Sequence, residues 1–145
     1  MLKKLMATNN DVAFTIVRVV LGIVFLAHGC QKMLGWFGGF GFHATMGFFT
    51  HMGMPAPLAF LIICTEFFGG LGLVLGLLTR IPALGIAGLM IGAIFMVHLQ
   101  NGFFMNWMGT QNGEGFEYHL LALAMAAAVL LRGAGAFSLD RALSK

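Results

Sequence analysis

The stretch LAFLIICTEFFGGLGLVLGLLTR, residues 58–80, decides the fold class. It is long enough for a helix to cross the ~30 Å hydrocarbon core of a bilayer, since a helix rises ~1.5 Å per residue. One carboxylate, Glu66, interrupts it. An acidic side chain near the middle of a membrane costs ~2.5–3.5 kcal/mol on insertion scales. We therefore expect Glu66 to face the interior of a helical bundle and to have a partner or a task.

The composition places the whole chain in the membrane class. Of its 145 residues, 59% are hydrophobic and only 9% are charged, and the mean hydropathy is +0.92. In soluble domains about a quarter of the residues are charged. The net charge of +3 comes from residues scattered at segment ends, not from a basic cluster with interleaved aromatics, which argues against a nucleic-acid partner. We predict an all-α integral membrane protein with one domain over residues 1–145.

Four apolar stretches predict a bundle of four transmembrane helices, at residues 12–30, 58–78, 82–99 and 117–131. We expect the first to be retained, because it contains Arg18 and is too long for the apolar part of a signal peptide. With four spans, most cations fall on one side and only Lys32 lies in the opposite loops. These cations are Lys3, Lys4, Arg80, Arg132, Arg141 and Lys145. The positive-inside rule then predicts that both termini are cytoplasmic.

The long connection between the first two spans predicts a short helix that lies at the membrane surface. Phe42, Met46 and Phe49 recur at helical spacing, which gives one apolar face. The other outer connection, residues 100–116, contains Phe103, Phe104 and Trp107. Aromatic residues of this kind are typical of the headgroup level of a membrane.

Ionisable residues gather at the outer ends of the predicted spans. Glu66 lies about eight residues, or ~12 Å, below that same face. We predict a polar pocket in the outer half, with Glu66, His98 and Glu117 as the candidate catalytic residues. The remaining candidate pocket residues are His28, Lys32, Glu114 and Tyr118.

One face of the first span carries cations and glycines. Arg18, Gly22, Phe25, Gly29 and Lys32 recur at spacings of three and four, so this face should look inward. The backbones of Arg18 and Glu66 should differ by ~6 Å in depth, which an arginine side chain can bridge. A structural ion pair between Arg18 and Glu66 is therefore one expectation. The other is an unpaired Glu66 that carries a proton.

Several interpretations of the histidines and cysteines remain open at this point. His28, His98 and His119 could be interfacial residues that bond loop carbonyls, and His28 with His98 could hold a haem. Glu66, His98 and Glu117 could bind a cation, but no close-spaced ligand motif is present and we predict no metal site. Cys30 and Cys64 should differ by ~9 Å in depth, so a disulfide would require distorted helix ends.

The chain resembles the DoxX family over nearly its full length. Five blocks in the same order carry the resemblance: residues 18–32 ending in His28-Gly29-xx-Lys32; Glu66-xx-Gly69-Gly70 with Gly76-Leu77-Leu78-Thr79-Arg80; His98-xxx-Gly102-Phe103-Phe104; residues 113–118; and Gly133-xx-Ala136-x-Ser138-Leu139-Asp140. The resemblance implies a small four-helix protein of the bacterial inner membrane, similar to the relatives of the DoxD subunit of thiosulfate:quinone oxidoreductase.

This resemblance points to a quinone-interacting subunit of a membrane oxidoreductase system, with quinone as the expected cofactor. The sequence shows no electron carrier, so electrons would come from a soluble or membrane redox partner, and it leaves open whether the chain is itself an enzyme. Two alternatives are a non-catalytic membrane anchor or assembly partner for redox enzymes, and a transporter of small solutes. Gly72-xxx-Gly76 and Gly88-xxx-Gly92 offer faces for close helix contact within a chain or in a homo-oligomer.

Overall fold

The computed structural model describes residues 5–144, and within them every regular element is helical. The elements are α2 (Val12–Leu34), α3 (Gly41–His51), α4 (Ala56–Cys64), η1 (Thr65–Gly69), α5 (Gly70–Leu75), α6 (Arg80–Ala93), η2 (Ile94–His98), η3 (Leu99–Asn101), α7 (Glu117–Arg132) and α8 (Leu139–Leu143). The segments η1 and η2 are single π-helical turns that continue α4 and α6, and η3 is a short 3₁₀ turn.

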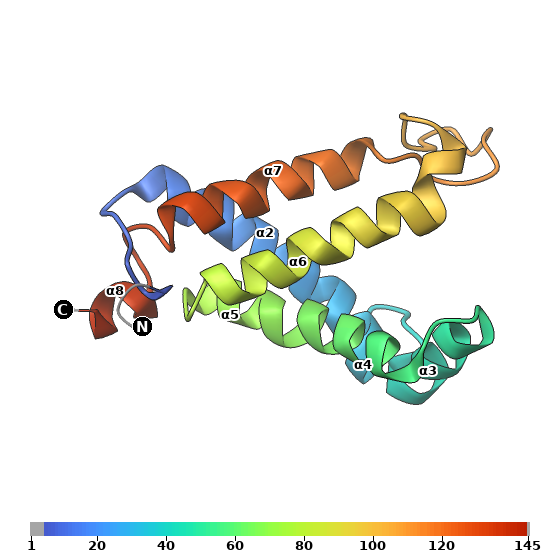
Figure 1. Cartoon of the computed structure of the whole chain (residues 1–145), viewed down its shortest axis with the longest axis horizontal. Helices are drawn as coiled ribbons and strands as arrows, with labels where there is room; N and C mark the ends of the chain where they lie inside the picture. Colours follow the sequence, from blue (N-terminus) through green and yellow to red (C-terminus); the bar gives the residue numbers. More distant parts are fainter. Residues whose placement is uncertain (1–4, 145) are drawn as a thin grey trace.

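The helices form four rods: α2, then α4–η1–α5, then α6–η2–η3, then α7 (Figure 1). Among the described residues three helices are long and apolar enough to cross a membrane: Val12–Leu34, Ala56–Leu75 and Arg80–Asn101. They match three of the four predicted spans in length and composition. The fourth rod, α7, has 16 residues, which is ~24 Å of helix, shorter than the hydrocarbon core. The core includes Leu21, Phe25, Leu73, Ile86 and Ala126.

The bundle has two ends that differ in content. We call the end with α3 and the loop 102–116 the outer end, and the end with α8 and residues 5–11 the inner end (Figure 1). The predicted helix between the first two spans is confirmed as α3, with Thr45 buried. Its depth in a bilayer stays a prediction.

Glycines let α2 and the second rod approach backbone to backbone. A Cβ added at Gly29 would lie 2.4 Å from the backbone nitrogen and Cα of Phe67, and one at Gly70 would lie 2.4 Å from the backbone nitrogen of Leu26. Such contacts are closer than any side chain allows, so only glycine fits. The face from Arg18 to Gly29 is buried, which confirms the prediction that it looks inward.

At the inner end, Arg18 closes the bundle instead of pairing with Glu66. Arg18 as a whole is 1% exposed. It donates to the carbonyl oxygens of Ala134 (2.7 Å), Val74 (2.9 Å) and Phe137 (2.6 Å), and also to that of Leu73. Gly76, at φ 71°, ends α5, so the carbonyl of Val74 lies beyond the last helical hydrogen bond, whereas that of Leu73 also accepts from the Gly76 N–H. Arg18 donates to carbonyls of both α5 and the C-terminal segment, and so joins the two.

The predicted Arg18–Glu66 ion pair is therefore wrong, and helix direction explains why. Side chains on a helix tilt toward its N-terminus. On α2 the N-terminus is at the inner end, so the Arg18 side chain is directed toward the inner end of the bundle. The second rod runs the opposite way, so Glu66 is directed toward the outer end. The two backbones also lie further apart in depth than predicted, because Glu66 is level with Gly29, which is 11 residues, or ~16 Å, from Arg18 along α2.

Asp140 holds the C-terminal segment on the inner turn. The residue is 1% exposed, and its carboxylate accepts hydrogen bonds from the backbone of Leu78 (2.6 Å) and from the backbone (3.0 Å) and hydroxyl (2.9 Å) of Thr79. Its own N–H donates to the carbonyl of Gly76 at 2.8 Å. The final block of the sequence resemblance thus has a structural role. The Ser138 hydroxyl caps α8 by accepting a hydrogen bond from the Arg141 N–H.

Candidate functional site

A short ion pair joins α2 to the second rod in the outer half. The Lys32 ammonium donates to Glu66 Oε2 at 2.5 Å. The side chain of Glu66 is 7% exposed and that of Lys32 is 25% exposed, so the carboxylate is buried beneath the ammonium. The same tilt that separates Arg18 from Glu66 brings Lys32 and Glu66 together, because Lys32 is directed down α2 and Glu66 is directed up the second rod.

Glu66 lies in the π-helical turn η1, next to Phe67, whose backbone meets Gly29 in a close contact of the two rods. A π turn inserts one extra residue into a helix and occurs often at functional sites. His98 is the last residue of the second π turn, η2. The candidate residues Glu66 and His98 thus both lie in irregular turns of otherwise regular helices.

A cavity of about 270 Å³ opens beside the ion pair, between the end of α2 and α3. Lys32 is one of its lining residues, and three phenylalanines provide aromatic walls. The lining residues are Gln31, Lys32, Gly38, Gly39, Phe40, Thr45, Phe48 and Phe49. The Gly39 backbone packs directly on that of Gln31, where a Cβ would lie 2.2 Å from the carbonyl oxygen. This contact folds the 35–40 loop back over the end of α2.

A stacked pair of histidines forms a second polar cluster in the outer half. The rings of His98 and His119 lie 4.0 Å apart between centroids, inclined by 40°. His98 Nδ1 lies 2.8 Å from the carbonyl oxygen of Glu114, which supports the interpretation of His98 as a residue that bonds a loop carbonyl. His119 is 5% exposed, and its Nδ1 is buried without a hydrogen-bond partner. Tyr118 packs edge-on against His119, with ring centroids 5.4 Å apart.

The two outer glutamates hold the loop 102–116 together. Glu117 Oε1 accepts from the backbone of Met105 (3.0 Å) and from the indole of Trp107 (3.3 Å). Glu114 Oε2 accepts from the backbone of Asn106 at 2.6 Å. Both carboxylates accept hydrogen bonds from donors in the loop, so they stabilise its conformation.

The predicted pocket residues are therefore divided between clusters. Glu66 and Lys32 are together, His98 lies with His119, and His28 is exposed on α2. Within residues 5–144 no three His, Cys, Asp or Glu side chains are close enough to hold a metal ion, so the ligand set of Glu66, His98 and Glu117 is not assembled. Cys30 and Cys64 are both free thiols.

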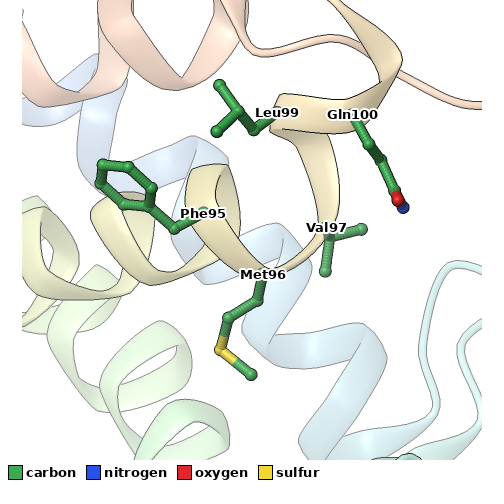
Figure 2. A pocket seen from close by; sticks show the side chains of 5 residues that line it. All are labelled: Phe95, Met96, Val97, Leu99 and Gln100. Carbon is green, nitrogen blue, oxygen red and sulfur yellow. The ribbon is translucent and has the colours of Figure 1, made fainter.

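A second hollow, of about 240 Å³, surrounds the π turn η2. Phe95, Met96, Val97, Leu99 and Gln100 line it, and Figure 2 shows these side chains leaving the turn in different directions. None of the predicted site residues is among them.

Comparisons with known proteins identify the family of the chain. The family model described as DoxX matches residues 13–99, which include Lys32, Glu66 and His98. The chain belongs to the DoxX family. It is 31% identical to "Inner membrane protein YqjF" of Escherichia coli, over 94% of this chain and 95% of that one. It is 35% identical to "Putative oxidoreductase CatD" of Bacillus subtilis, over 93% and 90%. No solved structure matches the sequence.

For this DoxX protein, sequence reasoning found both members of the ion pair but missed part of their surroundings. Gln31, Phe40, Thr45, Phe48 and Phe49 were not named as site residues. The spacing of Phe42, Met46 and Phe49 predicts a helix face turned to the membrane surface, whereas Phe49 of this set lines the cavity. The position of Gln31 next to Lys32 was a usable signal. His119 was noted, but its burial could not be read from the sequence.

Proposed function

We propose that this DoxX protein is a quinone-binding membrane subunit of an oxidoreductase system, with the quinone head group in the cavity between α2 and α3. The observation that carries the proposal is the double role of Lys32, which lines the cavity and pairs with the buried Glu66. The printed name of CatD, a putative oxidoreductase, supports redox chemistry in the family. Electrons would come from a separate redox partner.

The chemistry of the cavity suits a quinone head group. A quinone is a flat ring with carbonyl oxygens that accept hydrogen bonds. Phe40, Phe48 and Phe49 offer aromatic surface for the ring, and the Lys32 ammonium is a charged donor for a carbonyl oxygen. Glu66 stabilises the ammonium and is a carboxylate able to exchange a proton with it. The volume of about 270 Å³ is near the lower end of the ~300–1,000 Å³ of small-molecule sites, which suits one head group with its tail in lipid.

We further propose that α7 is the fourth span and that both chain ends are cytoplasmic. The described N-terminal and C-terminal segments meet at the inner end, where the Gly135 N–H donates to the Thr8 hydroxyl at 2.7 Å. Arg80, Arg132 and Arg141 belong to that end, whereas Lys32 lies at the outer end. A short apolar rod of this length spans a membrane when the bilayer thins locally. Reporter fusions to the C-terminus should be active only for a cytoplasmic reporter; activity of a periplasmic reporter there would contradict the topology.

The quinone proposal is tested by binding to the purified protein. Trp36 and Trp107 are the two tryptophans, so a Trp107→Phe background leaves Trp36, near the cavity, as the fluorescent probe. Menadione should quench this fluorescence in a saturable manner. Lys32→Met should weaken binding ten-fold or more, because a hydrogen bond from a charged donor contributes about 1.5–3 kcal/mol.

Controls separate loss of binding from loss of folding. His28→Gln changes an exposed residue one turn before Lys32 on the same helix, and it should leave the affinity unchanged. Phe48→Ala removes a cavity wall that is 60% exposed, so it should weaken binding without unfolding the protein. Equal, non-saturable quenching in all variants would exclude the quinone site and favour the anchor or transporter alternatives.

A further inference from the structure

Thr45 is a buried polar residue on the wall of the cavity, and its hydroxyl has no partner in the protein. The residue is 6% exposed and is the buried residue of α3. On the same helix the exposed Thr50 donates to the carbonyl oxygens of Met46 (3.0 Å) and Gly47 (3.1 Å). The Thr45 hydroxyl makes no such bond to any residue within 5–144. Because buried hydroxyls normally have a hydrogen-bond partner, that of Thr45 must come from the cavity.

The helix α3 presents Thr45 to the cavity together with two aromatic rings. Phe48 and Phe49 follow Thr45 by three and four positions, so the three side chains share one face of the helix, and all three line the cavity. Phe42 packs edge-on against Phe60 of α4, with ring centroids 6.1 Å apart, which holds α3 against the second rod. Within the described part of the chain, Thr45 Oγ1 is not among the unpartnered atoms that are closed off from solvent, so a molecule in the cavity can reach it.

The other polar side chains of the cavity are Gln31 and Lys32, and both already donate hydrogen bonds. Gln31 Nε2 donates to the carbonyl oxygen of Phe37 at 3.3 Å, and the Lys32 ammonium donates to Glu66. An ammonium has three protons, so Lys32 keeps donors for a ligand. Lys32 belongs to α2 and Thr45 to α3, so the cavity has a charged donor on one helix and a neutral hydroxyl on the other.

We propose that Thr45 is a specificity-determining residue that bonds a second oxygen of the head group while Lys32 bonds the first. The inference rests on the proposed quinone site, and it narrows the ligand to a ring with oxygens at two positions. A hydroxyl both donates and accepts hydrogen bonds. Thr45 can therefore donate to a quinone carbonyl and accept from the hydroxyl of the hydroquinone. A ring with a single carbonyl should use Lys32 alone, because the charged donor forms the stronger bond.

The test compares two ligands: menadione, with two carbonyls, and 1-tetralone, a similar bicycle with one. Menadione is followed by Trp36 fluorescence in the Trp107→Phe background, and 1-tetralone by its displacement of menadione. Thr45→Val replaces the hydroxyl with a methyl group. It should weaken menadione about two- to ten-fold, the effect of one neutral hydrogen bond, and leave 1-tetralone unchanged. Thr45→Ser keeps the hydroxyl and should bind menadione more tightly than Thr45→Val. Lys32→Met should weaken both ligands.

Thr50→Val is the matched control, because it makes the same change at a hydroxyl that is bonded within α3. It should alter the affinity for neither ligand. Without ligand, Thr45→Val should melt at or above the wild-type temperature, because no protein group loses a partner. An equal loss of both ligands in Thr45→Val, or no loss of either, would overturn the role of Thr45 and leave the quinone site standing. Failure of the wild type to bind menadione would overturn both.

Discussion

Replacement of Arg18 by methionine should prevent the DoxX protein from accumulating as a folded membrane protein. Methionine keeps the apolar stem but removes the donors to the carbonyls of Leu73, Val74, Ala134 and Phe137. A buried acceptor without a partner costs about 1–3 kcal/mol; the Leu73 carbonyl keeps the Gly76 N–H, so the other three cost about 3–9 kcal/mol. That is comparable to the whole stability of a typical domain, about 5–15 kcal/mol. The measurement is the yield of monodisperse protein in mild detergent and its melting temperature.

Arg132→Met is the matched control for Arg18→Met. Arg132 is an exposed arginine near the same end of the bundle, and its guanidinium lies 5.9 Å from the Phe14 ring centroid. An exposed cation–π contact contributes only about 0.5–1 kcal/mol, so this variant should melt close to the wild type. Equal melting temperatures for Arg18→Met and Arg132→Met would show that Arg18 does not close the inner end.

Gly29→Val should separate α2 from the second rod and break the Lys32–Glu66 pair. A Cβ at residue 29 would overlap the backbone of Phe67, which has no side-chain freedom to yield. Overpacking in a core costs about 1–3 kcal/mol and occasionally more, and a backbone clash belongs to the upper end. Because Lys32 lies one turn further along α2, the same displacement pulls its ammonium from Glu66. We expect a lower melting temperature and weaker menadione binding together.

Gly88→Val provides the control for Gly29→Val. A Cβ at residue 88 meets no atom within 4 Å in the single chain. The variant should therefore keep both the melting temperature and menadione binding of the wild type. Wild-type behaviour of Gly29→Val in both measurements would contradict the close approach of the two rods. If Gly88→Val alone alters the size of the solubilised particle, the Gly88-xxx-Gly92 face is a contact between copies of the chain.

The sequence was sufficient for the helical class because hydropathy and periodicity are local properties. Three spans, the helix α3 and the buried face of α2 follow from the spacing of apolar residues and glycines. Which charged residues pair with one another, by contrast, is not a local property of the sequence. Predicted depths put Arg18 within reach of Glu66, but the two rods pack with Gly29 beside Glu66, and the tilt of side chains on antiparallel rods then brings Lys32 to it.

The contacts of Glu117 and Asp140 are likewise not predictable from local sequence patterns. Glu117 stands at the start of α7 in a position that suits a pocket, yet loop donors from Met105 and Trp107 engage it. Asp140 lies in a short C-terminal helix whose contacts, with Leu78 and Thr79, are about 60 residues away in sequence. Such contacts depend on how loops return to the bundle, and no periodic pattern in the sequence records that return.

The most direct test of the central claim, that a quinone head group occupies the cavity beside Lys32, is photoaffinity labelling. Protein in native membranes would be irradiated with an azido-substituted naphthoquinone, and the labelled peptides would be located by mass spectrometry. We predict labelling within residues 31–49, lost on addition of excess menadione and reduced in Lys32→Met. Labelling confined to residues 95–100, or spread over lipid-facing helices without competition by menadione, would contradict the claim.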